Sequence, residues 1–249
     1  MMRKIWKSKE FDTAASFRLA SQLGVSQLMG KLLVSRGIEV PEVAQSYLYP
    51  TENDLHSPFL LPGMSDAVDR IKSALNTNEK IWIFGDYDVD GTTAASLLIN
   101  TFRYLGCSVE CHIPDRFDEG YGLNQEAIQS IANAGCGLLI TVDCGITSIA
   151  EVAFGNSLGV DTIITDHHLP SPKGLPSAHT IINPKLEGSQ YPFDGLAGIG
   201  LAFKLAHGLM DGQLNSFLVS QLDLVALGTV VDMVPLVDEN RVLSKLGLE

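Results

Sequence analysis

From Ser65 onward the chain repeats one pattern, in which a short and continuous apolar run is followed by a segment with helical apolar spacing. The runs are IWIF (81–84), SVECHI (108–113), LLITV (138–142), DTIIT (161–165) and HTIIN (179–183). Short apolar runs that alternate with helices are typical of strands in a parallel sheet that is buried on both faces. The sequence therefore predicts an α/β fold, with an open, mostly parallel sheet and helices on both of its faces.

The part before this repeat has a different character. Residues 12–35 have the apolar spacing of a helix, and four prolines punctuate the stretch 41–63 without any sustained period. We predict a small helical N-terminal segment and an irregular connector over residues 1–64, followed by one α/β domain over residues 65–249. Residues 198–231 predict two core helices, because they are apolar almost all round.

Charge is unevenly distributed along the chain. The net charge is −12, yet residues 1–40 contain seven basic and three acidic residues, so this segment is +4 and the remainder −16. The overall acidity argues against a surface that coats nucleic acid, and the excess of basic residues is confined to the N-terminal segment. The acidic body is consistent with cation binding.

Cysteine usage and hydropathy limit the class of protein. The four cysteines include no C-x2-C pair, so we expect reduced core residues and no zinc finger. The N-terminus has no apolar segment typical of a secretion signal, and no apolar run approaches the ~18 residues of a membrane span. A soluble, cytoplasmic protein without a membrane segment is the expectation.

Acidic residues follow three of the predicted strands. IWIF runs into GDYDVDG (85–91), LLITV into Asp143, and TIIT into Asp166-His167-His168. The carboxyl ends of parallel strands lie along one edge of a sheet, so these side chains should converge. Asp86, Asp88 and Asp90 would repel one another unless a cation neutralises them, which favours a divalent metal site. For Asp143 alone, an N-cap of the next helix is the open alternative.

Other ligand loops fit less well. D-x-D-x-D-G matches the start of a calcium loop, but the twelfth position counted from Asp86 is Leu97 instead of a glutamate, and an apolar strand precedes it. There is no phosphate loop of the G-x4-G-K-[ST] type, and the glycines of GLAGIG are not spaced for dinucleotide binding.

The donor types suggest the metal. Neutral imidazole binds Mn²⁺, Fe²⁺ or Zn²⁺ well, whereas carboxylates dominate Mg²⁺ and Ca²⁺ sites. Carboxylates mixed with His167 and His168, without a thiolate, indicate Mn²⁺, with Mg²⁺ as a plausible substitute. Asp232 follows the apolar run LGTVV and would need a partner if buried. The alternative for Asp232 is a helix end that faces water.

These segments also carry a family resemblance. GDYDVDG, ITVDCG, ITDHH and LGTVVDMVPL, in this order, resemble the four motifs of the DHH phosphoesterases. PDRFDEGYGLN (114–124) and LAGIGLAFKLA (196–206) are similar to the RecJ-type exonuclease branch of that family. The resemblance implies a site for two metal ions, Mn²⁺ above all. The implied metal ligands are Asp86, Asp88, Asp90, Asp143, His167, His168 and Asp232.

The resemblance also implies roles in catalysis. His168, Asp166 and Asp143 match catalytic positions, Asp143 as the acid that bridges two metals and Asp166 as the residue that orients a histidine. Arg116 and Tyr121 match substrate-binding positions, although Arg116 could equally form an ion pair with a neighbouring aspartate.

The implied function is that of a 5′ to 3′ exonuclease acting on single-stranded DNA in recombination and repair, with helicase and single-strand-binding proteins as partners. The alternatives are a DHH phosphodiesterase of short oligonucleotides or cyclic dinucleotides, and a non-catalytic DHH-fold partner of the replication or repair machinery. Members of this branch carry a second, DHH-associated domain that we do not find in these 249 residues, so we expect a truncated form.

Overall fold

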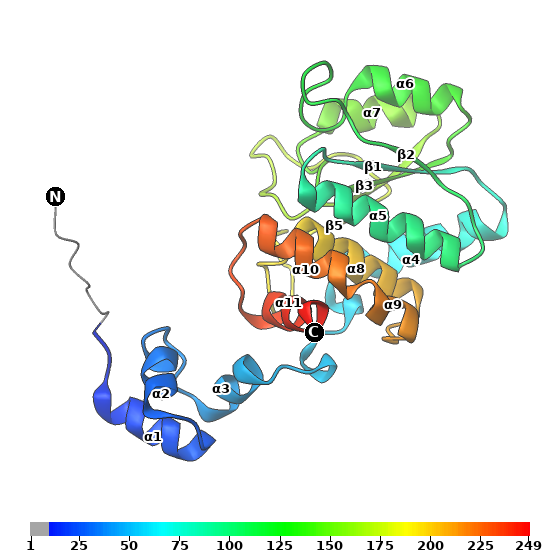
Figure 1. Ribbon diagram of the computed structural model, residues 1–249. Coiled ribbons are helices and arrows are strands. Elements are labelled where there is room, and N and C mark those ends of the chain that lie inside the picture. The colour runs from blue at the N-terminus through cyan, green and yellow to red at the C-terminus, as the bar shows by residue number, and fades with distance from the viewer. Residues whose placement is uncertain (1–9) are drawn as a thin grey trace. The chain divides into compact units, whose positions relative to one another are not determined.

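The structure is a computed structural model that describes residues 10–249 (Figure 1). The chain divides into two compact units, one that ends at Asp54 and one that runs from Leu55 to Glu249. The sequence placed the domain boundary after residue 64. Leu61 and Met64, however, are buried in the core of the larger unit, so the structure groups residues 55–64 with that unit.

The smaller unit is helical. Its helices are α1 (Thr13–Leu23), α2 (Gln27–Val34), α3 (Pro41–Leu48) and the 3₁₀ helix η1 (Glu52–Asp54). Asp12 caps α1 by accepting hydrogen bonds from the amides of Ala14 and Ala15, and Gly24 ends it in the left-handed conformation. Leu19, Leu33 and Ala44 form its small core. Four of the seven basic residues of segment 1–40, namely Arg3, Lys4, Lys7 and Lys9, lie outside the described residues.

Helix α3 corrects the expectation of an irregular connector. Pro41 occupies the first position of this helix, where a missing backbone N–H costs nothing and the fixed φ of proline suits the helix. The helix is eight residues long and ends at Leu48, with Tyr49 as its C-terminal cap. The prolines of this stretch therefore mark the start and the flank of a helix, and only the part after Leu48 lacks regular α-helix.

The larger unit contains a parallel sheet, which confirms the predicted fold class. Its strands are β1 (Ile81–Gly85), β2 (Glu110–His112), β3 (Leu138–Val142), β4 (Asp161–Thr165) and β5 (Thr180–Ile182). Their order is β2-β1-β3-β4-β5, and every neighbouring pair is parallel. The order reverses between β1 and β3, the place where ligands bind at the carboxyl edge of such sheets.

Helices cover both faces of this sheet (Figure 1). The helices of this unit are α4 (Met64–Asn76), α5 (Val89–Tyr104), α6 (Gln125–Asn133), α7 (Ile149–Ser157), α8 (Gly198–Leu209), α9 (Ser216–Ser220), α10 (Leu222–Val231) and α11 (Asp238–Leu248), with the 3₁₀ helix η2 (Pro58–Leu60) before them. Helix α10 packs on α5 and α8 instead of on the sheet, and α11 packs on α10. Neighbouring strand residues point to opposite faces, so Ile163 packs with α4, α5 and α8, whereas Ile164 packs with α6 and α7. The central strand β3 is therefore buried along its whole length, whereas the edge strand β2 begins with the exposed Glu110.

The C-terminal helices agree with the two predicted core helices only in part. Every residue of α8 is buried, as predicted for a core helix. The second predicted core helix is split into α9 and α10, and Leu227, Val230 and Val231 of α10 are exposed. Apolar residues on all sides of α10 thus do not mean burial on all sides. Within residues 10–249, no helix is both long and apolar enough to cross a bilayer.

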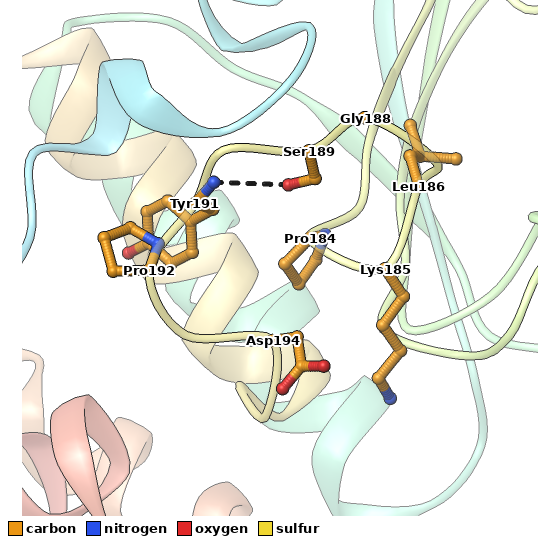
Figure 2. A pocket seen from close by; sticks show the side chains of 8 residues that line it. All are labelled: Pro184, Lys185, Leu186, Gly188, Ser189, Tyr191, Pro192 and Asp194. Atoms are coloured by element: carbon orange, nitrogen blue, oxygen red, sulfur yellow. Dashed lines mark hydrogen bonds between the residues drawn. The ribbon is translucent and has the colours of Figure 1, made fainter.

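A long loop joins β5 to α8. It lines an open pocket of about 430 Å³ whose lining includes Lys185, Tyr191 and Asp194 (Figure 2). The Tyr191 amide donates a 3.3 Å hydrogen bond to Ser189 Oγ and stabilises one bend of the loop. The loop therefore has a defined path from the edge of the sheet to the start of α8.

Candidate metal centre

The three acids after β1 are held at the start of α5. Asp86 directly follows the strand and is buried, Asp88 is the exposed N-cap of α5, and Asp90 is buried in the first turn. Asp88 Oδ1 accepts a 2.9 Å hydrogen bond from the Gly91 amide. A Cβ at Gly91 would lie 2.6 Å from the backbone nitrogen and oxygen of Asp86, so this turn requires glycine.

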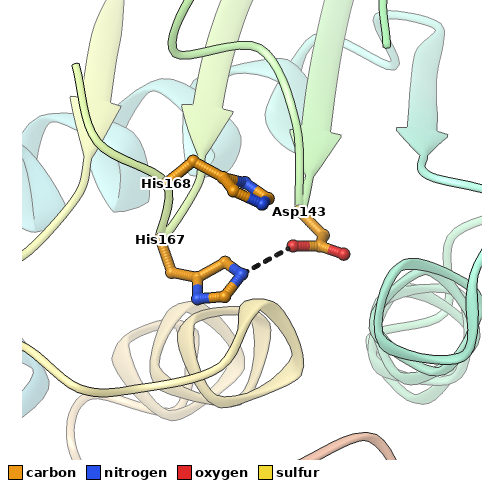
Figure 3. Close-up of side chains that lie close together, drawn as sticks. All are labelled: Asp143, His167 and His168. Carbon is orange, nitrogen blue, oxygen red and sulfur yellow. Dashed lines mark ion pairs between the residues drawn. The ribbon is translucent and has the colours of Figure 1, made fainter. Parts of the chain in front are cut away.

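Asp143 follows β3 and turns sharply away from the sheet. Its amide still donates to the Thr165 carbonyl of β4, but its φ of 60° is left-handed, a conformation uncommon outside glycine. Figure 3 shows its carboxylate facing the ring of His167, with Oδ1 3.1 Å from Nε2. The buried Oδ1 has no hydrogen-bond donor among the described residues.

The turn after β4 separates the roles of its two histidines. The His167 ring faces the carboxylates, with Nε2 3.9 Å from Asp90 and 3.8 Å from Asp232. The His168 ring lies 2.7 Å from Asp166 Oδ1 through Nδ1. Asp166 also accepts hydrogen bonds from the amides of His168 and Ile146. The histidine that Asp166 orients is therefore His168.

Asp232 closes the centre from the end of α10. It is the C-terminal cap of that helix and is only partly exposed. Its Oδ2 is buried and, within the part of the chain that the structure describes, lacks a hydrogen-bond donor. The alternative of a carboxylate that simply faces water does not describe this oxygen.

Three overlapping groups of potential ligands result. In each group the ligand atoms lie within 4.8 Å of one another. The groups are Asp86-Asp88-Asp143, Asp90-His167-Asp232 and Asp143-His167-His168. All seven residues expected to bind metal thus lie together at the carboxyl edge of β1, β3 and β4, and Asp143 and His167 each belong to two groups.

The N-terminus of α8 completes this arrangement. The amides of Gly198 and Ile199 donate hydrogen bonds of 2.6 and 2.7 Å to the two carboxylate oxygens of Asp90. A Cβ at Gly198 would lie 2.6 Å from Cβ and Oδ1 of Asp143. The sequence analysis missed these donors. The segment LAGIGLAFKLA was the available signal, but the sequence analysis used it only to reject a phosphate loop and to support the family resemblance, and gave its amides no role in the centre.

Burial and mutual repulsion dominate the electrostatics of the carboxyls. Burial raises the pKa of Asp90, and the charge of Asp143 adds to this effect. Burial likewise raises the pKa of Asp143, followed by the charge of Asp88. Burial also raises the pKa values of Asp86 and Asp232. A bound cation would offset this burial and repulsion and would stabilise the ionised carboxylates.

The two histidines are tuned in opposite directions. Burial lowers the pKa of His167, which keeps its imidazole neutral and able to bind a metal. The hydrogen bond to Asp166 raises the pKa of His168 to about 9, so this ring carries a proton at neutral pH. Burial alone would raise the pKa of Asp166. Hydrogen bonds from the His168 ring, the His168 amide and the Ile146 amide outweigh burial, so the pKa of Asp166 is lowered.

The two expected substrate contacts lie at the rim. The Arg116 guanidinium stacks over the Tyr87 ring at 4.5 Å from its centroid. Both line a pocket of about 610 Å³ that also includes Asp88, Asp90 and Asp232. Tyr121 Oη lies 3.5 Å from His168 Nδ1. Val89, Val231 and Met233 add an apolar lining to this pocket that sequence reasoning did not anticipate.

Comparisons with known proteins agree with this centre. The profile of the DHH family, N-terminal domain, matches residues 80–229, which include all of the residues expected to bind metal except Asp232. The single-stranded-DNA-specific exonuclease RecJ of Bacillus subtilis is 47% identical over 244 residues, a match that covers 98% of this chain and 30% of that protein. The chain therefore spans about a third of this relative's length.

Solved structures show the same relationship. A crystal structure of exonuclease RecJ bound to manganese superposes with a TM-score of 0.69 at 36% identity, covering 76% of this chain and 48% of that one. RecJ of Thermus thermophilus in complex with Mn²⁺ has a TM-score of 0.77 at 29% identity, covering 94% and 33%. The chain belongs to the DHH family, and its matches place it with the RecJ-type members.

Proposed function

We propose that this chain is the catalytic part of a metal-dependent nuclease that removes nucleotides from the 5′ end of single-stranded DNA in recombination and repair. The observation that carries the proposal is the overlap of three carboxylate and histidine groups at one edge of the sheet. The relatives support the substrate, since they are named as single-stranded-DNA-specific exonucleases.

The residues present fit a pair of divalent cations. Asp143 and Asp232 each hold a buried oxygen that no donor of the described residues satisfies, and a cation would supply the missing partner. Carboxylates mixed with a neutral imidazole suit Mn²⁺, with Mg²⁺ as a substitute. The proposed ligands are Asp88, Asp90, Asp143, His167 and Asp232, with Asp86 and His168 beside them.

Bound cations would neutralise a phosphodiester and make water a better nucleophile at neutral pH. The protein's own groups act around them. His168, held as a cation by Asp166, would stabilise negative charge on the non-bridging phosphate oxygens. Arg116 could hold a second phosphate oxygen from the rim of the pocket, and Tyr121 would restrain the His168 ring. Asp166 would thus act in catalysis by orienting and charging His168.

We further propose that residues 65–249 include the catalytic domain, that the protein acts in the cytoplasm, and that a helicase and a single-strand-binding protein are its partners. A helicase produces the single strands that such an enzyme consumes. The expected result is degradation of a labelled duplex only when a helicase is added; equal degradation without it would contradict this partnership.

The test of the function is a substrate panel with purified protein and Mn²⁺. We expect mononucleotides from a 5′-labelled single strand, slower loss of a 3′ label, and no attack on blunt duplex. The Asp143→Ala variant should release nothing, since it lacks a proposed ligand shared by two groups.

Other outcomes would redirect the proposal. Cleavage of dinucleotides or cyclic dinucleotides without attack on long single strands would identify a phosphodiesterase of short substrates. Mn²⁺ binding without release of any nucleotide from any substrate would favour a non-catalytic binding protein. Unaltered activity of Asp143→Ala would contradict the site itself.

A further inference from the structure

The edge of β5 contributes polar residues next to the centre. β5 pairs with β4, and the Asp166 amide donates to the Ile182 carbonyl at the end of β5. Asn183 follows directly and is fully buried. It therefore lies at the same edge of the sheet as the turn of Asp166, His167 and His168. The strand-end argument applied to HTIIN would have singled it out from the sequence.

Asn183 uses both ends of its side-chain amide. Nδ2 donates a 2.9 Å hydrogen bond to the backbone carbonyl of His168. Oδ1 accepts a 2.8 Å hydrogen bond from the amide of Lys185. The side chain thus ties the start of the long loop to the turn that presents the histidines.

Lys185 binds the other histidine. Its Nζ donates a 2.5 Å hydrogen bond to the backbone carbonyl of His167. Figure 2 shows its side chain extending from the loop that lines the neighbouring pocket. Burial raises the pKa of Asp232, and Lys185 is among the cations that oppose this rise. A positive charge therefore lies beside the carboxylates without being one of their direct partners.

Two residues of one loop thus hold the two successive carbonyls of the histidine turn. The position of an imidazole ring depends on its backbone, and metal binding tolerates little displacement of a ligand. We propose that Asn183 and Lys185 are positioning residues that hold the histidine turn, so that His167 is set to bind a divalent cation with His168 beside it. The inference rests on the proposed function, because it assigns these histidines to the metal centre.

Two variants test it. Asn183→Asp keeps the shape and the acceptor for the Lys185 amide but removes the donor to His168. Lys185→Met keeps the length of the side chain but removes the donor to His167. We expect each to raise the Mn²⁺ dissociation constant by about 10–100-fold, the effect of removing groups that orient metal ligands. Isothermal titration and the electron paramagnetic resonance spectrum of bound Mn²⁺ measure this without relying on activity.

Matched controls separate positioning from folding. Asn156 also donates through Nδ2 to a loop carbonyl, that of Ser177, but away from the histidine turn. Lys173 is an exposed lysine of the loop between β4 and β5. Asn156→Asp and Lys173→Met should bind Mn²⁺ as the wild type does. Lys185→Arg should recover most of the affinity that Lys185→Met forfeits, because it retains a donor and the charge. If Asn183→Asp does not fold, the comparison of Lys185→Met with Lys185→Arg tests the inference by itself.

The outcomes are distinguishable from those of the proposed function. Wild-type affinity and spectrum in both Lys185→Met and Asn183→Asp would overturn the inference. Loss of affinity in these variants, combined with no nucleotide release by the wild type, would contradict the proposed function and leave the positioning role standing. A wild-type chain that binds no Mn²⁺ would overturn both.

Discussion

At the scale of single residues, Asp143 decides the geometry of the centre. Its left-handed backbone turns the chain out of β3, so that its carboxylate faces His167. Such a conformation is unfavourable for most residues and persists only where the surroundings enforce it. Here it places an unsatisfied carboxylate oxygen where two ligand groups meet.

Removing the charge of Asp143 should stabilise the metal-free fold and abolish metal binding. Asp143→Asn removes a buried carboxylate whose pKa is raised by burial and by Asp88. We expect the metal-free melting temperature to rise by about 2–4 °C, the change that roughly 1 kcal/mol produces in a protein of this size. The increase in melting temperature on adding Mn²⁺ should disappear, together with nuclease activity.

Asp211→Asn is the matched control for this variant. Asp211 also has a left-handed backbone, but its side chain is 77% exposed and pairs with Lys72 away from the centre. Its variant should retain the Mn²⁺ effect. A lower metal-free melting temperature in Asp143→Asn than in the wild type would contradict the account of buried repulsion.

Metal affinity should depend on pH. The pKa values of Asp90 and Asp143 are raised in the folded protein, so cations must displace protons that these carboxyls hold more strongly than usual. The Mn²⁺ dissociation constant should therefore increase by about 10–100-fold between pH 8 and pH 6. Calorimetry in buffers of different ionisation enthalpy would count the released protons. Asp90→Asn should release fewer, and a pH-independent affinity would refute the role of these carboxyls.

The stability of the metal-free protein should also depend on pH, and it should decrease as the pH rises. A carboxyl with a raised folded pKa destabilises the folded state once pH exceeds its unfolded pKa of about 3.9. His168, whose pKa is raised to about 9, stabilises the fold fully below about 6.5, and this contribution disappears as pH rises through 9. Both effects lower stability toward alkaline pH. Urea unfolding in EDTA should show a shallower fall for His168→Gln; an unchanged slope would exclude the His168 contribution.

At the scale of secondary structure elements, the start of α8 is a part of the centre as much as the strand ends are. Its first amides bind both oxygens of Asp90, and its first residue packs against Asp143. A helix N-terminus favours negative charge, so α8 stabilises a carboxylate that other acids repel. The glycine at this point allows the close approach.

Gly198→Ala tests this packing. The new Cβ would lie 2.6 Å from the carboxylate side chain of Asp143, so either α8 or Asp143 must move. We expect a loss of about 1–3 kcal/mol of stability and weaker Mn²⁺ binding. Gly200→Ala, whose Cβ would meet the flexible side chain of Leu196 at 3.2 Å, should cost less. Equal Mn²⁺ affinity in the two variants would show that the packing of α8 does not affect the centre.

At the scale of the whole molecule, the excess of basic residues and the candidate metal centre lie in different parts of the chain. The larger unit holds the acidic centre, while segment 1–40 is +4 against −16 for the remainder. Of its basic residues, Arg18 and Arg36 are exposed and Lys31 is partly exposed on α1 and α2 or just after them. With Glu42, Glu52 and Asp54 included, residues 1–54 have a net charge of +1 against −13 for residues 55–249. We therefore predict that the smaller unit is the more favourable surface for a DNA backbone.

Substituting these three residues by glutamine should weaken single-strand binding and reduce its salt dependence. For a single strand, the slope of log affinity against log salt becomes shallower by ~0.7 for each phosphate that the protein no longer neutralises. Fluorescence anisotropy at several salt concentrations measures this slope. Lys72→Gln with Lys245→Gln on the larger unit is the control. An unchanged slope in the triple variant would exclude the smaller unit from DNA binding.

The fold and the centre were predictable to different extents. The sheet could be predicted because β1, β3 and β4 are buried on both faces and are therefore mainly apolar. The acids could be predicted because strand ends align at one edge. Helix α3 was missed because Pro41 was taken as a break when it occupies a first helical position. The exposure of α10 was missed because composition does not show which side a partner covers.

The amino-acid sequence alone determined the residue types of the centre and the edge at which they gather, since strand direction and period are local properties of the chain. Only the tertiary structure decided which residues form hydrogen bonds with which members of the centre. Asp166 holds His168 and not His167, the amides of α8 bind Asp90, and Asn183 with Lys185 holds the histidine turn. These partners lie on separate strands, helices and loops, and their hydrogen bonds depend on distances that no local pattern encodes.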